Sequence, residues 1–471
     1  MHIVAAFSSS RYSIRLFDLK GVRAIGHSCP QNIFLTLCLV ILALLFASIG
    51  AWAADIPSTE NADLTPIRGQ MDFNRCMRVA LERSPYFTNS SLDISVKRLD
   101  ESDARYSLYP TLSLHTSYFL NNASVLVGEN QPFSIGFYTN PYNPIESYFT
   151  LKASKLITRM AIYGHLQVIS GAILRMGNLF LELDSLGRTA AFQDEIIAIN
   201  QKDLAYAKNR VKSESASPLD VRMAEQELQL AQLEKERITA AQAAHMDEVK
   251  TVIGLKAEDR LELDLGGVRQ QVLNAFDPAS ATLEQVRSNS YDLKIQSLKK
   301  ELQGLNVTLA YARFLPTVNL VVQSGDPLNA GATGAYYAYI NADMPIWDGL
   351  KRVHNVTRQK DVLSQYNAEE RTKEIDLNTA WTNARRRLVE ADAALNMARS
   401  QEELARLQNK QIEISYEEGR QTHSQYLSAS KRSIDVKRNS DQKELEYLEA
   451  DLALYALSGE LSRRFVAPDS F

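Results

Sequence analysis

The sequence predicts an α+β protein in which one module of short strands and long helices is present twice. One observation is a stretch of 69 residues, 350–418, that has the pattern of a single helix. A second is that motifs from the first half of the chain recur in the second half. A third is that several runs alternate apolar and polar residues over the length of a strand.

The longest predicted element extends from Leu350 to Glu418 and contains neither glycine nor proline. It lies between Gly349 and Gly419, and apolar residues in its middle alternate at spacings of three and four, as in a coiled-coil seam. At about 1.5 Å per residue, this helix is expected to be about 100 Å long. A helix of that length does not fit inside an ordinary compact domain, so we expect its length to serve the function.

The N-terminal part of the chain has the pattern of a secretory signal. Basic residues precede an uncharged apolar run over 33–49, and Ala51-Trp52-Ala53 follows with small residues at the positions that signal peptidase requires. We expect residues 1–53 to be a signal peptide, with an uncleaved inner-membrane anchor as the alternative. Beyond it no apolar run of membrane-helix length occurs. An exported chain is then soluble, peripheral or inserted as a barrel.

Charge and residue types narrow the function. The formal net charge is −4, which argues against a nucleic-acid partner. Cys76 is the only cysteine after the signal, so no internal disulfide is expected. The motifs of phosphate-binding loops, zinc peptidases and serine hydrolases do not occur, and no two of the later histidines have the helical spacing of metal ligands. We expect no enzymatic activity, catalytic residue, cofactor or metal.

An internal repeat divides the chain after the signal. The segment 106–114 resembles 311–320, and a glycine at 254 recurs at 459. Each repeat is expected to contain an amphipathic helix, two strands, a long helix and a shorter helix, with the first helix over 72–106 or 283–312. The expected organisation is an N-terminal linker over 54–71, a first repeat over 72–255, an inter-repeat linker over 256–281, a second repeat over 282–459 and a C-terminal tail over 460–471.

The four strand-like runs lie near 112–118, 149–154, 318–323 and 337–344, and each has one apolar and one mostly polar face. Four strands are too few to enclose a pore, so a barrel requires several copies of the chain. A soluble sheet with one wet face alternates in the same way and is the alternative. On the barrel interpretation, the lipid-facing residues are Leu112, Leu114, Leu320, Val322 and Ile340, and the lumen-facing residues are Ser113, His115, Asn319 and Asn341.

The breaks after the two long helices carry a recognisable motif. The first reads Arg-Val-Lys-Ser-Glu-Ser-Ala-Ser-Pro-Leu-Asp-Val over 210–221, and the second reads Tyr-Glu-Glu-Gly-Arg-Gln-Thr-His-Ser-Gln-Tyr-Leu over 416–427. Together with Met-Pro-Ile-Trp-Asp-Gly over 344–349, they resemble the TolC family of outer-membrane efflux proteins. The resemblance covers nearly all of 72–459.

The resemblance implies a homotrimer in the outer membrane of a Gram-negative-type cell. Each chain would give four transmembrane β-strands to a twelve-stranded barrel, in contact with outer-membrane lipid, and long helices to a periplasmic α-helical coiled-coil tunnel. The implied function is a passive duct for small molecules, working with a periplasmic adaptor protein and an inner-membrane pump or ABC transporter. The duct of a type I protein secretion system shares this fold. A periplasmic coiled-coil scaffold without a channel is the alternative of a different class.

The resemblance also assigns roles at the helix breaks. The adaptor is expected to contact the tips, at Glu214, Ser217, Gly419 and Thr422. The gate is expected to involve Asp220, which would accept hydrogen bonds from Tyr416 and Arg420. The alternative is that Asp220 only helps to cap its own helix.

Three features depart from the family pattern. Glu214 replaces the glycine of the first tip, so the turn is expected to be reshaped or the helix extended. Gln425 and Ser428 replace an aspartate ring, which puts cation selectivity in doubt. Glycines at 164, 171, 177 and 187 interrupt the first long helix, and we expect close helix contacts or a bend there.

Overall fold

The computed structural model describes residues 70–118, 133–215, 217–256, 258–274, 276–278, 280–324 and 336–465. The predicted signal peptide and most of the N-terminal linker lie outside the described residues. The chain divides into two compact units. In one of them the described residues are Tyr118, Phe133 and Ser134, each at a strand end. The other unit contains all described helices and the rest of the strands.

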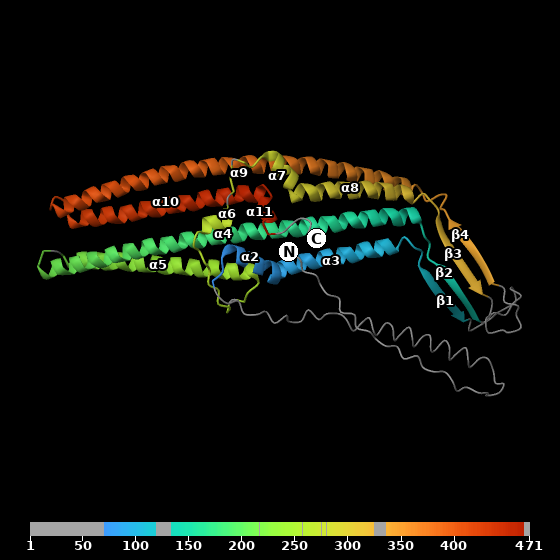
Figure 1. Cartoon of the computed structure of the whole chain (residues 1–471), viewed down its shortest axis with the longest axis horizontal. Helices are drawn as coiled ribbons and strands as arrows, with labels where there is room; N and C mark the ends of the chain where they lie inside the picture. Colours follow the sequence, from blue (N-terminus) through green and yellow to red (C-terminus); the bar gives the residue numbers. More distant parts are fainter. Residues whose placement is uncertain are drawn as a thin grey trace, which may run out of the picture. The chain divides into compact units, whose positions relative to one another are not determined.

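The predicted order of elements occurs twice in the described chain (Figure 1). The first copy consists of α2 (Phe73–Arg83), α3 (Pro85–Tyr106), β1 (Leu112–Tyr118), β2 (Phe133–Thr139), α4 (Pro144–Lys212) and α5 (Pro218–Ile253). The second consists of α7 (Leu283–Asn289), α8 (Tyr291–Ala312), β3 (Thr317–Ser324), β4 (Tyr336–Asp343), α9 (Lys351–Glu417) and α10 (His423–Leu457). Two short helices, α6 (Val268–Leu273) and α11 (Glu460–Arg463), follow the first and second copies respectively.

The first helix of each copy was predicted to be continuous, and this is wrong. Ser84 separates α2 from α3 with a ψ of 126°, because the following Pro85 disfavours helical backbone in the residue before it. In the second copy Ser290 separates α7 from α8 with a ψ of 116°, and its side chain caps α8 by accepting a bond from Leu293 N–H. Each copy therefore has a short helix and a longer one where the sequence predicts a single helix.

The strand predicted near 149–154 is also wrong, since these residues belong to α4. The side chain of Asn143 accepts hydrogen bonds from the backbone N–H groups of Ile145 and Glu146, and Pro144 occupies the first helical turn. This capped start places the following residues in the helix. The second strand of the copy lies earlier in the chain, at β2.

The long helices are confirmed, and α9 ends within one residue of each predicted boundary. The glycines of α4 do not interrupt it, and it is the longest described helix, with 69 residues. A Cβ at Gly177 would lie 2.7 Å from Leu452 Cδ2, so Gly177 marks a close contact with α10. By length and composition α4 could also cross a membrane, but half of its most apolar window is buried within the protein, as in an ordinary core helix.

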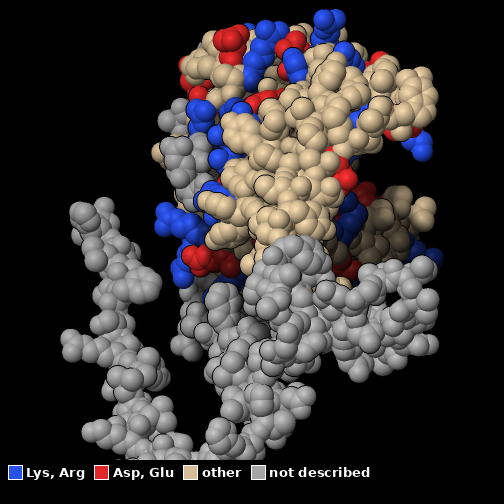
Figure 2. Space-filling model, turned by 90° about the vertical axis from the view of Figure 1, so that its right-hand side faces the viewer, with Lys and Arg blue, Asp and Glu red and all other residues tan. Residues whose placement is uncertain are grey.

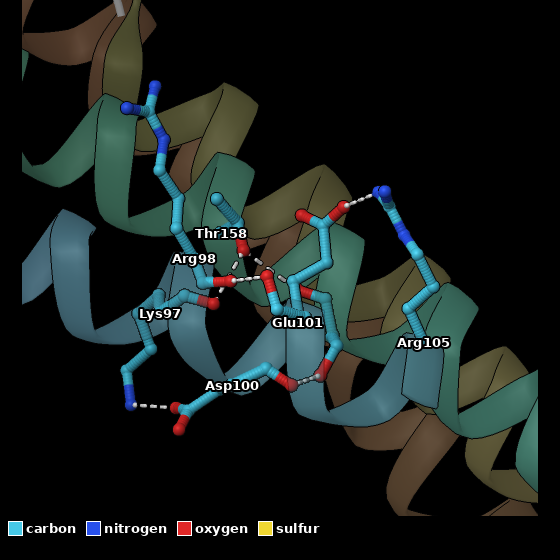
Figure 3. Close-up of polar contacts among 8 residues, drawn as sticks. Lys97, Arg98, Asp100, Glu101, Arg105 and Thr158 are labelled. Carbon is cyan, nitrogen blue, oxygen red and sulfur yellow. Dashed lines mark hydrogen bonds and ion pairs between the residues drawn. The ribbon is translucent and has the colours of Figure 1, made fainter. Parts of the chain in front are cut away.

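The helices form antiparallel pairs that lie alongside one another (Figure 1). Helix α4 packs against α3, α5, α8 and α10, and α9 packs against α8 and α10. Where α3 meets α4, the hydroxyl of Thr158 donates to the backbone oxygen of Lys97 at 3.2 Å (Figure 3). The charged groups nearby pair along α3 itself, as Lys97 does with Asp100 at 3.2 Å. Here the hydroxyl of α4 joins the two helices, while the ion pair stays within α3.

The main apolar core lies where α2, α4, α5, α6, α10 and α11 meet, and its buried side chains include Phe73, Phe180 and Leu452. Two glycines end the shorter helices at this level. Gly254 has a φ of +83° and a Cβ there would lie 3.0 Å from Ser84 Cα, at the break between α2 and α3. Gly459 has a φ of +73° and a Cβ there would lie 2.6 Å from Asn289 Cβ, at the break between α7 and α8. Each helix terminus is thereby fitted against the kink of its own repeat.

Buried amide side chains bond to the backbone of a neighbouring helix in both repeats. On α4, Gln193 donates to the backbone oxygen of Ala231 at 2.8 Å, and Asn200, seven residues later, donates to α5 as well. On α8, Gln303 donates to the backbone oxygen of Gln359 at 2.9 Å, and Gln296 donates to α9 seven residues earlier. All four amides are at most 5% exposed, so each bond satisfies a group that water does not reach.

Asp451 is a buried carboxyl group on α10 and should make the helical unit more stable at acidic pH. It is 4% exposed, and its Oδ1 has no hydrogen-bond partner among the described residues. Burial raises the pKa of Asp451 to about 6, against the attraction of Arg269. A carboxyl group whose pKa is higher in the folded than in the unfolded protein destabilises the fold when it is ionised, at pH values above about 6. The destabilisation disappears as the pH falls from about 6 to about 4, because the group becomes protonated in the folded protein first. Asp451→Asn should therefore stabilise the protein at neutral pH by about 1–3 kcal/mol and flatten the pH dependence.

Thermal unfolding of the detergent-solubilised protein, followed by circular dichroism at pH 7.5 and 5.5, tests this expectation. Asp435→Asn is the matched control on the same helix. Asp435 is exposed and pairs with Arg438 at 3.1 Å, so its neutralisation should change the stability little at either pH. Equal effects of the two substitutions at both pH values would contradict the assignment.

Candidate functional site

The four strands form one sheet in the order β1-β2-β3-β4, with β3 antiparallel to both β2 and β4. The outer strands are β1 and β4, and within the described part of the chain no further strand pairs with them. A sheet with two open edges presents unpaired backbone donors and acceptors on both sides. These edges are sites at which another strand can be added.

The register gives the sheet two chemically different faces. Leu320 pairs directly with Ile340, and Asn319 pairs directly with Asn341, so that apolar and amide side chains alternate in matching rows. Ile340 is 71% exposed within this protomer. Leu112, Leu114 and Leu320 are also exposed, whereas Val322 is half-buried.

On the opposite face, Val321 pairs with both Tyr138 and Tyr339, and the rings of Tyr138 and His115 meet edge to face. Charged residues are rare on the strands, where Asp343 is the only Asp, Glu, Lys or Arg. Seen from the side on which the strands lie, the middle of the molecule is correspondingly free of charge over a broad area (Figure 2). The assignment of the two faces to lipid and lumen stays a prediction.

At the other end of the long helices, the first tip joins α4 to α5. Glu214 has a φ of +55°, so a residue other than glycine adopts the left-handed backbone here and the helix ends at Lys212. The turn closes when Ser215 N–H donates to the backbone oxygen of Arg210 at 2.9 Å. Ser217 then caps α5. The expectation of an extended helix at this tip is wrong, since Glu214 takes the conformation that glycine would take.

The second tip, between α9 and α10, has the same construction. Gly419 has a φ of +74°, Arg420 N–H donates to the backbone oxygen of Ser415 at 2.8 Å, and Thr422 caps α10. Both caps are reciprocal. The backbone N–H of Thr422 donates to the side-chain oxygen of Gln425, as the backbone N–H of Ser217 donates to the carboxylate of Asp220. The two breaks are therefore equivalent in backbone as well as in sequence position.

Glu214→Gly should stabilise the first tip by about 1–2 kcal/mol, because left-handed backbone is unfavourable for any residue with a Cβ. Hydrogen exchange at the end of α4 would report this as slower exchange at the amides that bond to the last turn. Ser213→Gly is the control, since the φ of Ser213 is −91° and glycine gains nothing there. Faster exchange in Glu214→Gly would contradict the expectation.

Two of the three residues predicted for the gate lie near the same cavity. Asp220 and Tyr416 line the same cavity of about 730 Å³ between the two tips. Within this protomer, however, Asp220 accepts a bond from the backbone N–H of Ser217 at 3.0 Å, and Arg420 forms an ion pair with Glu418. The capping alternative for Asp220 is thus realised in the described chain. Hydrogen bonds from Tyr416 and Arg420 to Asp220 are not among its contacts.

The partner of Tyr416 is His423, which sequence reasoning did not single out. Tyr416 Oη and His423 Nδ1 are 3.1 Å apart. The ring of His423 also lies on that of Tyr206 from α4, with centroids 3.9 Å apart. On its other side Tyr416 stacks on Tyr426, with centroids 5.0 Å apart and the rings nearly parallel. These side chains join the tip of the second repeat to a helix of the first.

No family model and no curated protein matches the sequence. Solved structures nevertheless share the fold. The outer-membrane channel OprN aligns with a TM-score of 0.70 at 15% identity over 82% of this chain and 89% of its own. CusC, whose structures are described in terms of transmembrane channel formation, aligns with a TM-score of 0.70 at 12% identity over 86% and 95% of the two chains. VceC, an outer membrane protein of Vibrio cholerae, aligns with a TM-score of 0.68 at 14% identity over 82% and 96%.

Proposed function

We propose that this chain, which has the fold of outer-membrane channel proteins, is one protomer of a passive duct through the outer membrane of a Gram-negative-type cell. The observation that carries the proposal is the sheet. It has four strands, two open edges and an exposed apolar face around Ile340. Open strand edges are not tolerated in lipid, so insertion requires closure with other copies of the chain. Three copies would supply a twelve-stranded barrel, large enough to enclose a pore.

The long helices are proposed to extend the duct into the periplasm. Two helical hairpins of similar length leave the sheet in each protomer, α4 with α5 and α9 with α10, and both end in equivalent tips. We propose that the tips, at Glu214, Ser217, Gly419 and Thr422, contact a periplasmic adaptor that links the duct to an inner-membrane pump or ABC transporter. Photo-crosslinkers at Ser217 and Thr422 should then capture one adaptor protein in cells.

We propose small molecules as the substrates. The duct of a protein secretion system shares this fold and is the alternative, and the substrate that accumulates in a deletion strain distinguishes the two. Asp220, Tyr416 and Arg420 remain part of the proposed gate, since Asp220 and Tyr416 line one cavity between the tips. Bonds between them would form when three protomers bring further tips alongside. A periplasmic scaffold without a channel is less well supported, because it would leave the apolar strand face in water.

The test is planar-bilayer conductance of the detergent-purified protein, with its oligomeric mass measured in parallel. We expect a trimer that conducts ions through one pore. A protein that stays soluble without detergent and never conducts would overturn the proposal, and a monodisperse monomer that conducts would overturn the trimeric barrel.

A further inference from the structure

We propose that His423 is the latch residue of the gate, and that it holds the two helical hairpins together by the insertion of its ring between Tyr206 and Tyr416. This inference rests on the proposed duct and assigns the closing contact to a different side chain from those of the gate described above. The contacts of His423 reach both repeats. Tyr206 belongs to α4 of the first repeat, whereas Tyr416 belongs to α9 of the second.

The position of His423 makes it suitable for this role. It is the first residue of α10, directly after the N-cap Thr422, so its backbone is fixed by the capping box. Its ring centroid is 3.9 Å from that of Tyr206 and 5.8 Å from that of Tyr416. The Nε2 atom is buried and has no hydrogen-bond partner among the described residues. The ring is therefore held by packing against Tyr206 and by one hydrogen bond with Tyr416 Oη.

An ion pair that also connects the hairpins near the tips is weaker. Lys431 on α10 pairs with Glu227 on α5 at 2.5 Å, and the Glu227 side chain is 54% exposed. Exposed ion pairs contribute little because water screens them. Aromatic contacts keep their strength at such a site, since apolar ring surface is removed from water when they form. Closure at this level thus depends mainly on the rings.

The cavity beside the latch gives the rings room to separate. It measures about 730 Å³ and is lined by Tyr206, Tyr416 and His423. Carboxylates of Asp203, Asp220 and Glu227 and the guanidinium of Arg210 line the same cavity, so water can fill it when the rings part. The latch accordingly opens into a polar space, and no apolar core has to be disrupted.

The test compares the resting conductance of single-residue variants in planar bilayers. His423→Ala and Tyr206→Ala should each raise the open-to-closed ratio by about fivefold or more, the change expected for the loss of one ring contact. The increase in the open-to-closed ratio of the double variant should be smaller than the product of the two single increases, because both substitutions remove the same contact. His423→Phe keeps a ring against Tyr206 and should fall between wild type and His423→Ala. Arg406→Ala, which removes an exposed ion pair within α9, is the control and should conduct like wild type.

A distance measurement tests the latch independently of ion conduction. Spin labels at Lys212→Cys and Glu417→Cys lie on the exposed ends of α4 and α9. The distance between them should lengthen or broaden in His423→Ala and stay unchanged in Arg406→Ala. Unchanged distances and wild-type conductance in both His423→Ala and Tyr206→Ala would overturn the latch. A wild-type protein that never conducts, with distances that still respond to His423→Ala, would overturn the duct and leave the latch standing.

Discussion

Replacement of Leu320 or Ile340 by arginine should prevent the strands from inserting into a bilayer. The two side chains are direct partners on β3 and β4, and both are exposed on the apolar face of the sheet. An arginine on the lipid side near the bilayer midplane costs about 2–4 kcal/mol, because its charge loses its hydration. Folding of urea-denatured protein into lipid vesicles, measured as protection from protease, should fall strongly for either variant and further for the pair.

The neighbouring row of the same strands supplies the matched control. Asn319 and Asn341 are also direct partners, one residue away from the apolar pair. Asn319→Arg and Asn341→Arg should insert normally and alter single-channel conductance instead. If the asparagine variants fail to insert while the apolar-face variants insert, the two faces have been assigned in reverse. If all four variants insert and conduct alike, the sheet does not line a pore.

Substitution of alanine for Gly254 or Gly459 should lower the free energy of unfolding by about 2–5 kcal/mol in each case. Left-handed backbone contributes about 1–2 kcal/mol of this, since alanine has a Cβ. The remainder, about 1–3 kcal/mol, comes from overpacking, because the added carbon would lie 3.0 Å from Ser84 Cα at Gly254 and closer still to its neighbour at Gly459. At Gly459 the nearest atom is Asn289 Cβ at 2.6 Å, and the backbone at that break has to move.

Gly419→Ala separates the two contributions. Gly419 has a φ of +74°, close to those of the other two glycines, but a Cβ there would meet no atom within 4 Å. Its substitution should lower stability by about 1–2 kcal/mol only. Thermal unfolding of the purified variants in one detergent gives the comparison. Equal destabilisation by all three substitutions would mean that packing against the helix breaks contributes nothing.

The sequence alone predicts the duplication, the long helices and three of the four strands, because each depends on a pattern repeated over many residues. The second predicted strand is wrong because the six residues from Phe149 alternate like a strand, although a helix-start signal precedes them. Asn143, Pro144 and Glu146 form that signal, and a capped helix start outweighs a short alternation. The true strand, β2, contains Gly136 and so has a weaker strand pattern.

The tips show where sequence reasoning stops. The capping pairs Ser217 with Asp220 and Thr422 with Gln425 are local, and their spacing can be read directly. The contact of His423 with Tyr206 joins residues of different repeats, and no periodicity relates them. Such a contact follows from how two hairpins lie side by side, which depends on packing along their whole length.

The buried amides on α4 and α8 determine how the long hairpins can move. Gln193 and Gln303 each bond to a backbone oxygen of the neighbouring helix. If one helix slid along its neighbour, the side-chain N–H groups of both amides would lose their acceptors while still buried, each at about 1–3 kcal/mol. Axial sliding is therefore opposed at several levels, while bending of a whole hairpin breaks none of these bonds. We therefore expect each hairpin to move as one rigid unit. The mouth of the proposed tunnel would then widen by an outward rotation of each hairpin about its end near the apolar core.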